Sequence, residues 1–412
     1  MSEHCVIIGA GHGAAQLCAS LRKDKWEGPI TLIGDEPSLP YHRPPLSKSQ
    51  LNPKGENELQ FLRAKDFYEC NDIKVLTSTW VDSVHAAQKE IVIGDQRIAY
   101  DKLVLAVGST HRTPPIQGVD DPHVFALRTA EDADAMREAI SDSESAVIIG
   151  AGFIGLEVAA SLRKLGLDVS VIEVAPRVLV RVASEDVSAF FEKLHTQNGV
   201  TLHTGSTVSA IENNGEILTV IGDDLSIDCD FVVMGTGAAA STALAESAGL
   251  TIDNGIVVNE YNQTSDPNIY ALGDCCNQHS SLYATPLRLE SVQNAVDQAK
   301  TVAAALTGNP VAHTALPWFW SDQYDVKLQI AGVSTGYDRV VLRGTPEPGE
   351  RFSAWYFKGD RLLAVDAIND TKAYALGSKL LNSGCQPNPE LLANPSVEGR
   401  EVLTQAKETS GV

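Results

Sequence analysis

Two stretches of the chain carry the same order of hydrophobic and polar positions. In the clearer one, a β-branched apolar run at 146–149 predicts a buried parallel strand, and the glycine-rich turn GAGFIG follows at 150–155. Apolar residues then recur at helical spacing up to residue 165, and the apolar run at 168–172 predicts a second strand. The pattern is therefore strand, glycine turn, helix, strand.

The glycine spacing and the acid after the second strand indicate a dinucleotide-binding unit. In such a turn Gly150 makes the bend, Gly152 lets a pyrophosphate approach the backbone, and Gly155 lets the helix pack closely on the strand. The phosphates bind at the positive end of the helix, which has Ile154 in its first turn. Glu173 ends the second strand, where it would accept hydrogen bonds from a ribose 2′-hydroxyl and repel a 2′-phosphate, so the unit favours NAD over NADP.

The other copy lies at the N-terminus. An apolar run at 6–8 precedes the turn GAGHGA, a helical segment covers 15–21, and the strand at 30–33 leads to Asp35 in the ribose-binding position. The small residues that we expect to line this turn are Gly9, Gly11, Gly13 and Ala14. Two such units predict two dinucleotides, and the expected pair is FAD at the N-terminus and NAD in the middle of the chain.

Further patterned segments extend these units. They predict, in chain order, a helix at 183–195, strands at 201–208, 217–220 and 228–234, a turn at Gly237 that closes the NAD-binding region, a helix at 290–306, alternating strands from about residue 324, and a helix at 371–381. We expect roughly the last fifteen residues to be frayed.

The predicted fold class is α/β. It combines two nested Rossmann-like dinucleotide-binding domains with a C-terminal α+β domain, which is the three-domain plan of glutathione reductase. We expect a discontinuous FAD-binding domain at 1–112 and 248–322, an NAD-binding domain at 113–247, and the C-terminal domain at 323–412.

Composition narrows the choice of partners and setting. The net charge of −21 argues against nucleic acid and anionic membrane as partners. No apolar run reaches the roughly 20 residues that a membrane-spanning helix needs. The seven cysteines form no C-x-x-C and no metal-ligand spacing, so we predict no metal site and a reducing, cytoplasmic setting.

Six motifs resemble, in order and spacing, those of one family: YHRPPLSK, FALRTAEDA, GAGFIGLEVAASLR, ALGDCC, RLESVQNA and PWFWSDQY. From Cys5 to about Ser383 the chain resembles the putidaredoxin-reductase-like, FAD-dependent NADH:ferredoxin reductases of bacterial cytochrome P450 and aromatic-ring dioxygenase systems. The resemblance implies that a hydride passes from NADH to FAD and that single electrons then reach a [2Fe–2S] ferredoxin. That ferredoxin would supply a P450 or a ring-hydroxylating oxygenase.

The resemblance also implies roles for single residues. Lys48 and Glu157 are expected to meet near the flavin and the nicotinamide, where a cation stabilises negative charge and a carboxylate fixes the cation. Trp320 is expected to stack at the flavin edge. The implied FAD contacts, besides the first glycine turn, are Asp35, Arg43, Lys48, Val81, Ala106, Arg128, Asp274 and Val292. The first turn departs from the family pattern at His12-Gly13.

Two other functions remain open. One is an NADH reductase for rubredoxin or a small-molecule acceptor, and the other is a redox-signalling flavoprotein like apoptosis-inducing factor, which shares the three-domain plan. Thiol chemistry is disfavoured, because disulfide reductases and flavin peroxidases need cysteine near the second strand and residues 35–51 contain none.

The distribution of charge predicts where an acidic ferredoxin would dock. Residues 327–379 hold eight Lys and Arg against six Asp and Glu, in a chain whose overall charge is strongly negative. We therefore expect docking on the C-terminal domain, near Arg339 or Lys372.

Overall fold

The computed structural model describes residues 2–55, 57–215 and 217–410, and the chain divides into two compact units. The first unit comprises Met1–Arg43, Glu58–Thr110 and Ala238–Ala315. The second comprises Pro44–Asn57, His111–Gly237 and Leu316–Val412. The segment with Lys48 thus belongs to the second unit, and the boundaries of three separate domains stay a prediction.

A five-stranded parallel sheet forms the centre of the first unit, with strand order β19-β7-β1-β2-β3. Its strands are β1 (Cys5–Ile8), β2 (Ile30–Ile33), β3 (Ile73–Leu76), β7 (Lys102–Leu105) and β19 (Ile269–Ala271). The two main helices are α1 (His12–Lys23) and α7 (Val292–Leu306). Helix α7 matches the helix predicted at 290–306, and the side chain of Ser291 caps its first turn.

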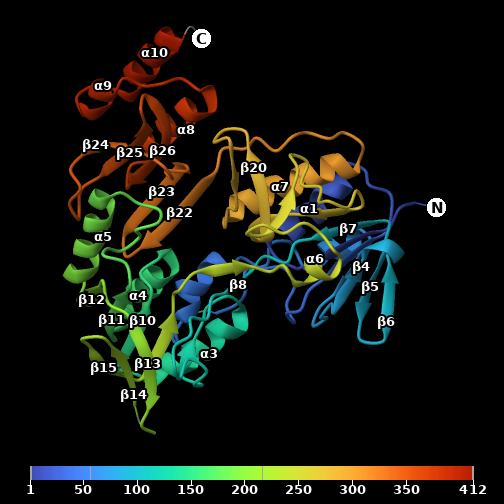
Figure 1. The fold of residues 1–412 in the computed structure, drawn as a ribbon, viewed down its shortest axis with the longest axis horizontal. Helices are drawn as coiled ribbons and strands as arrows, with labels where there is room; N and C mark the ends of the chain where they lie inside the picture. The colour runs from blue at the N-terminus through green and yellow to red at the C-terminus, as the bar shows by residue number, and fades with distance from the viewer. Residues whose placement is uncertain (1, 56, 216, 411–412) are drawn as a thin grey trace. The chain divides into compact units, whose positions relative to one another are not determined.

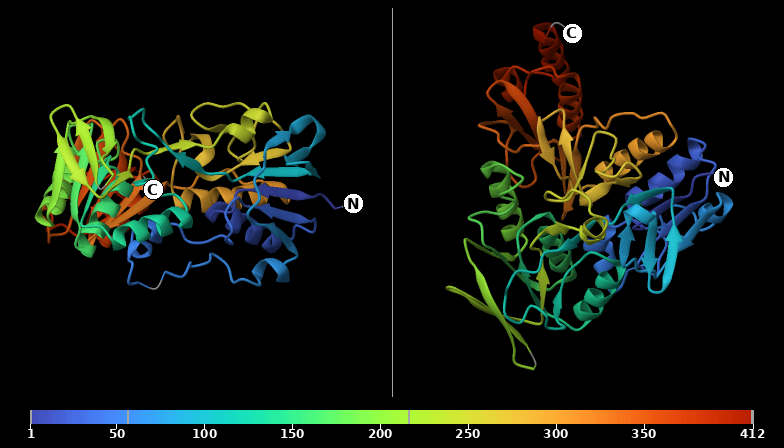
Figure 2. Two further views of the ribbon diagram at one scale, coloured as in Figure 1. Left: turned by 90° about the horizontal axis from the view of Figure 1, so that it is seen from below. Right: turned by 45° about the vertical axis from the view of Figure 1, so that its right-hand side comes forward.

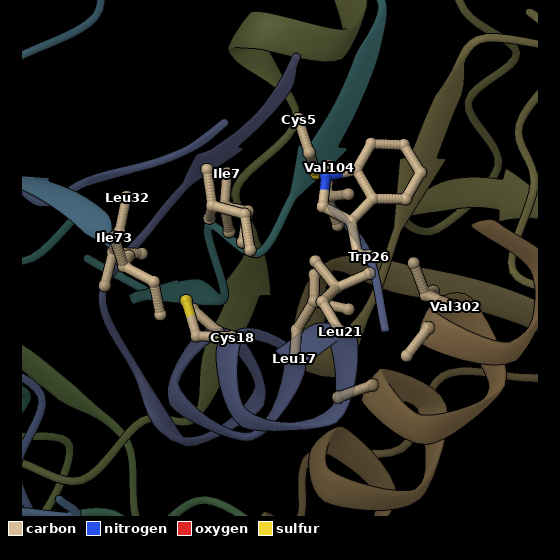
Figure 3. Packing of buried hydrophobic residues seen from close by; sticks show 14 of the residues in the cluster. Cys5, Ile7, Leu17, Cys18, Leu21, Trp26, Leu32, Ile73, Val104 and Val302 are labelled. Carbon is tan, nitrogen blue, oxygen red and sulfur yellow. The ribbon is translucent and has the colours of Figure 1, made fainter. Parts of the chain in front are cut away.

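The two faces of this sheet are covered differently (Figure 1). On one face, Cys5 and Ile7 of β1 pack with Leu17 and Leu21 of α1 and with Val302 of α7 (Figure 3). The alternate residues of β1 pack on the other face with residues of a small antiparallel sheet. Alternation along one buried strand therefore supplies both cores.

The remaining elements of the first unit are short. They are α2 (Phe67–Cys70), β4 (Ser83–His85), β5 (Glu90–Ile93), β6 (Gln96–Ala99), β8 (Ser109–His111, at the boundary), β17 (Ala238–Ala240), α6 (Ala243–Ser247), β18 (Ile256–Val258), β20 (Cys276–Ser280), β21 (Thr285–Leu287), and the 3₁₀ turns Ala86–Gln88 and Gly273–Cys275.

The second unit repeats the parallel arrangement with strand order β12-β11-β10-β16-β9. Its strands are β9 (Val124–Phe125), β10 (Ser145–Ile149), β11 (Asp168–Glu173), β12 (Val200–Thr204) and β16 (Phe231–Met234). Its helices are α3 (Ala130–Ser141), α4 (Phe153–Leu165) and α5 (Glu185–Gln197), with 3₁₀ turns at Pro44–Ser47 and Ser49–Leu51. The central strands β1 and β10 thus hold equivalent positions in the two sheets, as the internal repeat predicts.

An antiparallel sheet covers one face of this parallel sheet and extends as a long ribbon (Figure 2). It consists of β13 (Val208–Asn213), β14 (Leu218–Gly222) and β15 (Ser226–Cys229). Two sequence expectations were wrong here. The single strand expected at 201–208 is split at Gly205, which has a positive φ of 67°, and the one expected at 228–234 is two strands divided at Asp230.

A second five-stranded sheet, antiparallel throughout, completes the second unit in the order β22-β23-β26-β25-β24. Its strands are β22 (Trp318–Gln323), β23 (Val326–Gly332), β24 (Arg339–Gly344), β25 (Phe352–Lys358) and β26 (Arg361–Ile368). Helix α8 (Thr371–Ser383) packs on this sheet, and α9 (Pro389–Ala393) follows.

The expectation of a frayed C-terminus was wrong. Helix α10 (Gly399–Ser410) forms at the end of the chain, where Figure 2 shows it beyond the C-terminal sheet. Val402 and Ala406 lie one helical turn apart on the same side and are both fully buried in the core that includes Leu376 of α8. Burial of this narrow apolar face stabilises a helix whose other positions are mostly polar.

Candidate functional site

The first glycine turn joins β1 to α1 at the carboxyl edge of the first sheet. Gly9 has a φ of 101°, and a Cβ there would lie 2.2 Å from the carbonyl oxygen of Ala106, at the end of β7. Gly11 is the N-cap of α1, and a Cβ there would meet nothing within 4 Å. No side chain forms a capping hydrogen bond at this helix start, which is the arrangement expected of an anion-binding turn.

The third small position differs between the two turns. A Cβ on Gly13 would lie 2.3 Å from Cδ1 of Leu272 and 3.2 Å from the Ala295 carbonyl oxygen, so a larger residue there would have to displace the Leu272 side chain. Ala14, which aligns with the third glycine of the second turn, is fully buried and tolerates its methyl group.

His12 is a feature of the first turn that motif reasoning noted only as a departure. Its Nε2 atom is buried and has no hydrogen-bond partner among the described residues. Burial lowers the pKa of His12 to about 4, and the nearby His42 and Arg43 act in the same direction. A neutral imidazole with an unsatisfied nitrogen therefore stands at the N-terminus of α1.

Arg43 is held by a small polar cluster within the first unit. Its guanidinium lies 2.5 Å from Glu36 Oε1, and the Tyr41 hydroxyl donates to the other oxygen of the same carboxylate at 2.5 Å. Burial alone would lower the pKa of Arg43, but Tyr41 and Glu36 raise it above its ordinary value. Asp35 accepts the backbone N–H of Glu36 at 3.1 Å. Sequence reasoning did not single out Glu36, although it directly follows Asp35.

The other expected flavin contacts are spread over several elements. Asp274 lies in the 3₁₀ turn after β19 and accepts a hydrogen bond from Ser109 at 3.2 Å. Val81 is buried just before β4, and Val292 is the first residue of α7. Arg128 belongs to the second unit, immediately before the N-cap of α3, where its backbone N–H donates to Asp132 at 2.8 Å.

The second glycine turn joins β10 to α4. Gly150 has a φ of 107°, and a Cβ there would lie 2.4 Å from the Gly235 carbonyl oxygen. A Cβ on Gly155 would lie 2.2 Å from the carbonyl oxygen of Gly150, so only glycine allows α4 to pack this closely. Gly152, the N-cap, again has open space in front of it and no side-chain cap. The turn therefore has the geometry expected of a nucleotide cradle.

Glu173 is fixed at the end of β11. Its two carboxylate oxygens accept backbone N–H groups from Ala151 at 2.7 Å and Ala175 at 2.9 Å, which leaves further lone pairs for ribose hydroxyls. Two apolar side chains next in sequence to this region are exposed, Ile154 at 48% and Val174 at 67%. Gly237, at the far end of the region, has a φ of 91° and accepts the N–H of Arg112.

Lys48 and Glu157 form an ion pair within the second unit. Lys48 Nζ lies 2.6 Å from Glu157 Oε2, and Glu157 is only 4% exposed. The Ser47 hydroxyl donates to the same oxygen at 2.7 Å, and the Ser321 hydroxyl donates to Oε1 at 2.8 Å. Sequence reasoning missed both serines, because a small polar residue carries no periodic signal.

Trp320 stands on β22 in an aromatic cluster. Its ring centroid lies 5.3 Å from that of Trp318 and 6.3 Å from that of Phe319, and Phe319 in turn packs on Phe153 of α4 at 4.8 Å. Strand alternation puts Trp320 on the face of β22 opposite to Phe319 and Ser321.

Known proteins resemble the chain over almost its full length. Residues 3–299 match the pyridine nucleotide-disulphide oxidoreductase family, and residues 318–403 match the reductase C-terminal family. Putidaredoxin reductase CamA of Pseudomonas putida is 40% identical, with 98% of both chains covered. The chain belongs to the putidaredoxin-reductase-like pyridine nucleotide-disulphide oxidoreductases.

A further relative and a solved structure agree with this assignment. Rhodocoxin reductase of Rhodococcus erythropolis is 41% identical over 98% of this chain and 95% of its own length. The putidaredoxin reductase in its covalent complex with putidaredoxin has a similar fold, with a TM-score of 0.94 and 39% identity over 98% of this chain and 99% of that chain. The α/β fold with Rossmann-like sheets and a β-rich C-terminal part is confirmed.

The family binds FAD and NAD(H), and the residues present fit two such groups. Both helices that follow a glycine turn start without a side-chain cap, and both N-cap glycines face open space. The buried Nε2 of His12 beside the first turn, which has no hydrogen-bond partner in the described part of the chain, also fits a site that a polar group completes. In the second unit, the carboxylate of Glu173 at the end of β11 is held by a backbone N–H group, which also fits a nucleotide-binding turn.

Three further observations concern chemistry away from these turns. All seven cysteines are free thiols, and the adjacent Cys275 and Cys276 are buried with their sulfurs 3.9 Å apart. Among residues 2–55, 57–215 and 217–410, no group of three or more His, Cys, Asp or Glu side chains could hold a metal ion. In the same ranges, no helix combines the length and apolarity needed to cross a membrane.

Proposed function

We propose that the protein is an NADH-dependent ferredoxin reductase. It would take a hydride from NADH and pass electrons singly to a [2Fe–2S] ferredoxin that supplies a cytochrome P450 or a ring-hydroxylating oxygenase. The observation that carries this proposal is the full-length similarity, C-terminal sheet included, to a reductase whose complex with putidaredoxin is known.

Bound FAD supplies the exchange between two-electron and one-electron chemistry, and the chain supplies binding, orientation and charge. The first glycine turn, from Gly9 to Ala14, and Asp35 would hold FAD, together with the flavin contacts implied by resemblance, which are Arg43, Lys48, Val81, Ala106, Arg128, Asp274 and Val292. The second turn, with Gly150, Gly152, Ile154, Gly155 and Gly237, would hold NADH. Glu173 would select NADH by accepting hydrogen bonds from the ribose hydroxyls.

Lys48, Glu157 and Trp320 would act at the site of hydride transfer. A lysine held by a buried carboxylate keeps its positive charge in one place, so the protein need not reorganise when negative charge develops nearby. Trp320 would offer an aromatic face, and Trp318, which lies on the same face of β22 with its ring 5.3 Å away, would fix its orientation.

Electrons would leave without a thiol relay. Residues 35–51 contain no cysteine, and Cys275 and Cys276 are buried neighbours whose sulfurs are not bonded. Such adjacent residues do not favour a redox-active disulfide. This argues against the thiol chemistry of the disulfide reductases.

The domain boundaries and the cellular setting are part of the same proposal. An FAD-binding domain at 1–112 and 248–322, an NAD-binding domain at 113–247 and a C-terminal domain at 323–412 are supported by the two equivalent parallel sheets and by the family match at 318–403. Seven free cysteines support a reducing compartment, and we place the protein in the cytoplasm.

The decisive experiment measures both halves of the reaction with the FAD-loaded protein. Stopped-flow mixing with NADH or NADPH follows flavin reduction, and cytochrome c reduction is then followed with and without a [2Fe–2S] ferredoxin. We expect faster reduction by NADH and ferredoxin-dependent cytochrome c reduction. If electrons reached rubredoxin or a quinone, without ferredoxin, as fast as they reach ferredoxin, a different acceptor would be favoured. Slow turnover with a long-lived reduced complex would favour a signalling flavoprotein.

A further inference from the structure

A buried chain of hydrogen bonds runs from Glu157 into the second unit, away from Lys48. Ser321 donates to Glu157 Oε1 at 2.8 Å, and Gln323 Nε2 donates to Ser321 Oγ at 3.2 Å. His195 Nε2 lies 2.8 Å from Gln323 Oε1, and the Tyr324 hydroxyl lies 3.4 Å from His195 Nδ1. The three middle residues, Ser321, Gln323 and His195, are each at most 1% exposed.

The carboxylate sets the direction of every bond in this chain. Because ionised Glu157 can only accept, Ser321 donates to it, so Ser321 must accept from the amide nitrogen of Gln323. The amide oxygen of Gln323 then faces His195, which must carry its hydrogen on Nε2. Nδ1 of His195 is left to accept from Tyr324. All the bonds therefore point their donors toward Glu157.

This chain of hydrogen bonds contributes oriented dipoles around Glu157 but no second positive charge. Burial lowers the pKa of His195 to about 4, and its hydrogen bond to Gln323 only partly opposes this, so the imidazole is neutral at pH 7. The amide of Gln323 also interrupts any proton path between His195 and Glu157, because an amide does not readily pass a proton on. The arrangement is thus suited to holding a carboxylate in place and not to relaying protons.

Helix and strand periodicities explain how the sequence builds this contact. Phe153 and Glu157 are one helical turn apart on α4, about 6 Å, and Phe319 and Ser321 are two residues apart on β22, about 7 Å. Phe153 packs on Phe319, and Glu157 then meets Ser321. Further along, Lys164 of α4 donates to the Tyr324 carbonyl oxygen at 2.8 Å, which is a further contact between the helix and the end of β22.

We propose that Ser321, Gln323 and His195 are positioning residues for the hydride-transfer step, which act by orienting Glu157 and through it Lys48. The hydrogen bonds of Lys48 go to Pro44, Ser47 and Glu157, so the effect of Ser321, Gln323 and His195 on it would pass through the carboxylate. This proposal rests on the proposed function, because it presupposes that Lys48 and Glu157 serve hydride transfer. Strand β22 of the C-terminal sheet would then have two functions, because it carries Trp320 and also the residues Ser321 and Gln323.

The test compares Ser321→Ala, Ser321→Thr and Gln323→Leu in the FAD-loaded protein by single-turnover reduction with NADH. Loss of a hydrogen bond to a buried charge should lower the limiting rate about tenfold in Ser321→Ala, with the dissociation constant for NADH within about twofold. Ser321→Thr should restore the rate, and Gln323→Leu should lower it although Gln323 does not touch Glu157. Ser353 is another buried serine of the same sheet, and it accepts the Trp355 indole N–H, so Ser353→Ala should leave the rate unchanged.

A double-mutant cycle separates this proposal from the proposed function. Glu157→Gln should lower the limiting rate, and adding Ser321→Ala should then have no further effect. If Glu157→Gln itself left the rate unchanged, the role proposed for the ion pair would fail. If Glu157→Gln slowed the reaction but Ser321→Ala did not, or if Ser321→Thr were as slow as Ser321→Ala, the positioning role alone would be overturned. Should Ser321→Ala not fold, Gln323→Leu in the same cycle decides the question.

Discussion

The ammonium of Lys48 lies 2.6 Å from the carboxylate of Glu157, although the two residues are 109 positions apart in the chain. Lys48 follows two consecutive prolines, Pro44 and Pro45, and directly precedes the short 3₁₀ helix Ser49–Leu51. Glu157 lies in the second turn of α4, the helix that follows the second glycine-rich segment. The pair therefore connects helix α4, which follows the second glycine turn, with the segment that contains Lys48. Because Glu157 is nearly fully buried, its charge depends on this partner and on the two serine hydroxyls.

Replacing Lys48 by methionine should slow reduction of the bound flavin by NADH about 10- to 100-fold, because the site loses its cation and Glu157 loses its partner. Stopped-flow absorbance gives the rate. Lys54→Met is the matched control, since Lys54 is an exposed lysine of the same segment. Equal rates for both variants would contradict a role for Lys48.

Substitutions of two glycines in the second turn should have different effects, one on NADH binding and the other on stability. In Gly152→Ala the new methyl group enters open space before α4, so thermal stability should be retained while NADH binds about tenfold or more weakly. In Gly155→Ala the methyl group would lie 2.2 Å from a backbone oxygen, so the unfolding temperature should fall. Calorimetry and NADH titration of both variants check the contrast, and a stable Gly155→Ala protein would refute the packing argument.

Glu173→Gln should raise the ratio of kcat/KM for NADPH to that for NADH by about tenfold. The amide oxygen can still accept one backbone N–H, but the charge that repels a 2′-phosphate is gone. Steady-state assays with both nucleotides measure the ratio. Asp168→Asn, which removes a charge at the opposite, exposed end of the same strand, should leave it unchanged. An unchanged ratio in Glu173→Gln would mean that other residues select the nucleotide.

The sequence predicted those parts that depend on local pattern. Each glycine turn lies between a short apolar strand and a helix, so spacing alone located Gly9 to Ala14 and Gly150 to Gly155. The meeting of Lys48 with Glu157 could be expected only through family resemblance, because no local pattern relates residues 109 positions apart. The polar chain from Ser321 to His195 was not predicted, since buried polar residues are satisfied by tertiary contacts that periodicity does not encode.

The predictions about element boundaries that were wrong have local causes in the sequence. Gly205 lies inside the segment 201–208, which we expected to be strand throughout, and its positive φ marks the break between β12 and β13. Helix α10 was missed because only Val402 and Ala406 of its twelve residues are buried, which leaves too narrow an apolar face to stand out from the sequence.

Charge reversal at Arg339 or Lys372 should weaken ferredoxin reduction. Both residues are exposed on the C-terminal part of the chain, and Arg339 stacks over the Phe357 ring at 5.1 Å. We expect Arg339→Glu and Lys372→Glu to raise the KM for ferredoxin several-fold at low salt, with less effect at high salt, while flavin reduction by NADH is unchanged. Arg400→Glu, exposed on α10, is the control, and equal behaviour of all three variants would place docking elsewhere.

Arg343 is unsuited to this test despite its charge. Its guanidinium donates to the carbonyl oxygens of Leu392, Asn394 and Val397 at 2.5–3.0 Å, so it fixes the chain after α9. Its replacement should lower stability, and a loss of ferredoxin reduction there would not report on docking.

Asp366 should make stability depend on pH. It is fully buried on β26, the Tyr356 hydroxyl donates to Oδ2, and Oδ1 has no partner within the described ranges. Burial raises the pKa of Asp366 to about 7, against an opposing effect of the Tyr356 hydrogen bond. The folded protein therefore retains a proton that the unfolded chain has lost, so this carboxyl contributes most stability below about pH 4, and the contribution is lost as the pH rises toward 7.

The variant Asp366→Asn removes this titration because its amide stays neutral. The free energy of unfolding of Asp366→Asn, relative to that of the unsubstituted protein, should rise between pH 5 and pH 8 by an amount on the order of 2 kcal/mol. Urea unfolding of both proteins across this range measures the difference. Asp360→Asn, exposed at the turn before the same strand, should give a difference that does not vary with pH. A flat difference for Asp366→Asn as well would mean that Asp366 is ionised in the folded protein at pH 5, with its charge stabilised in place by Tyr356.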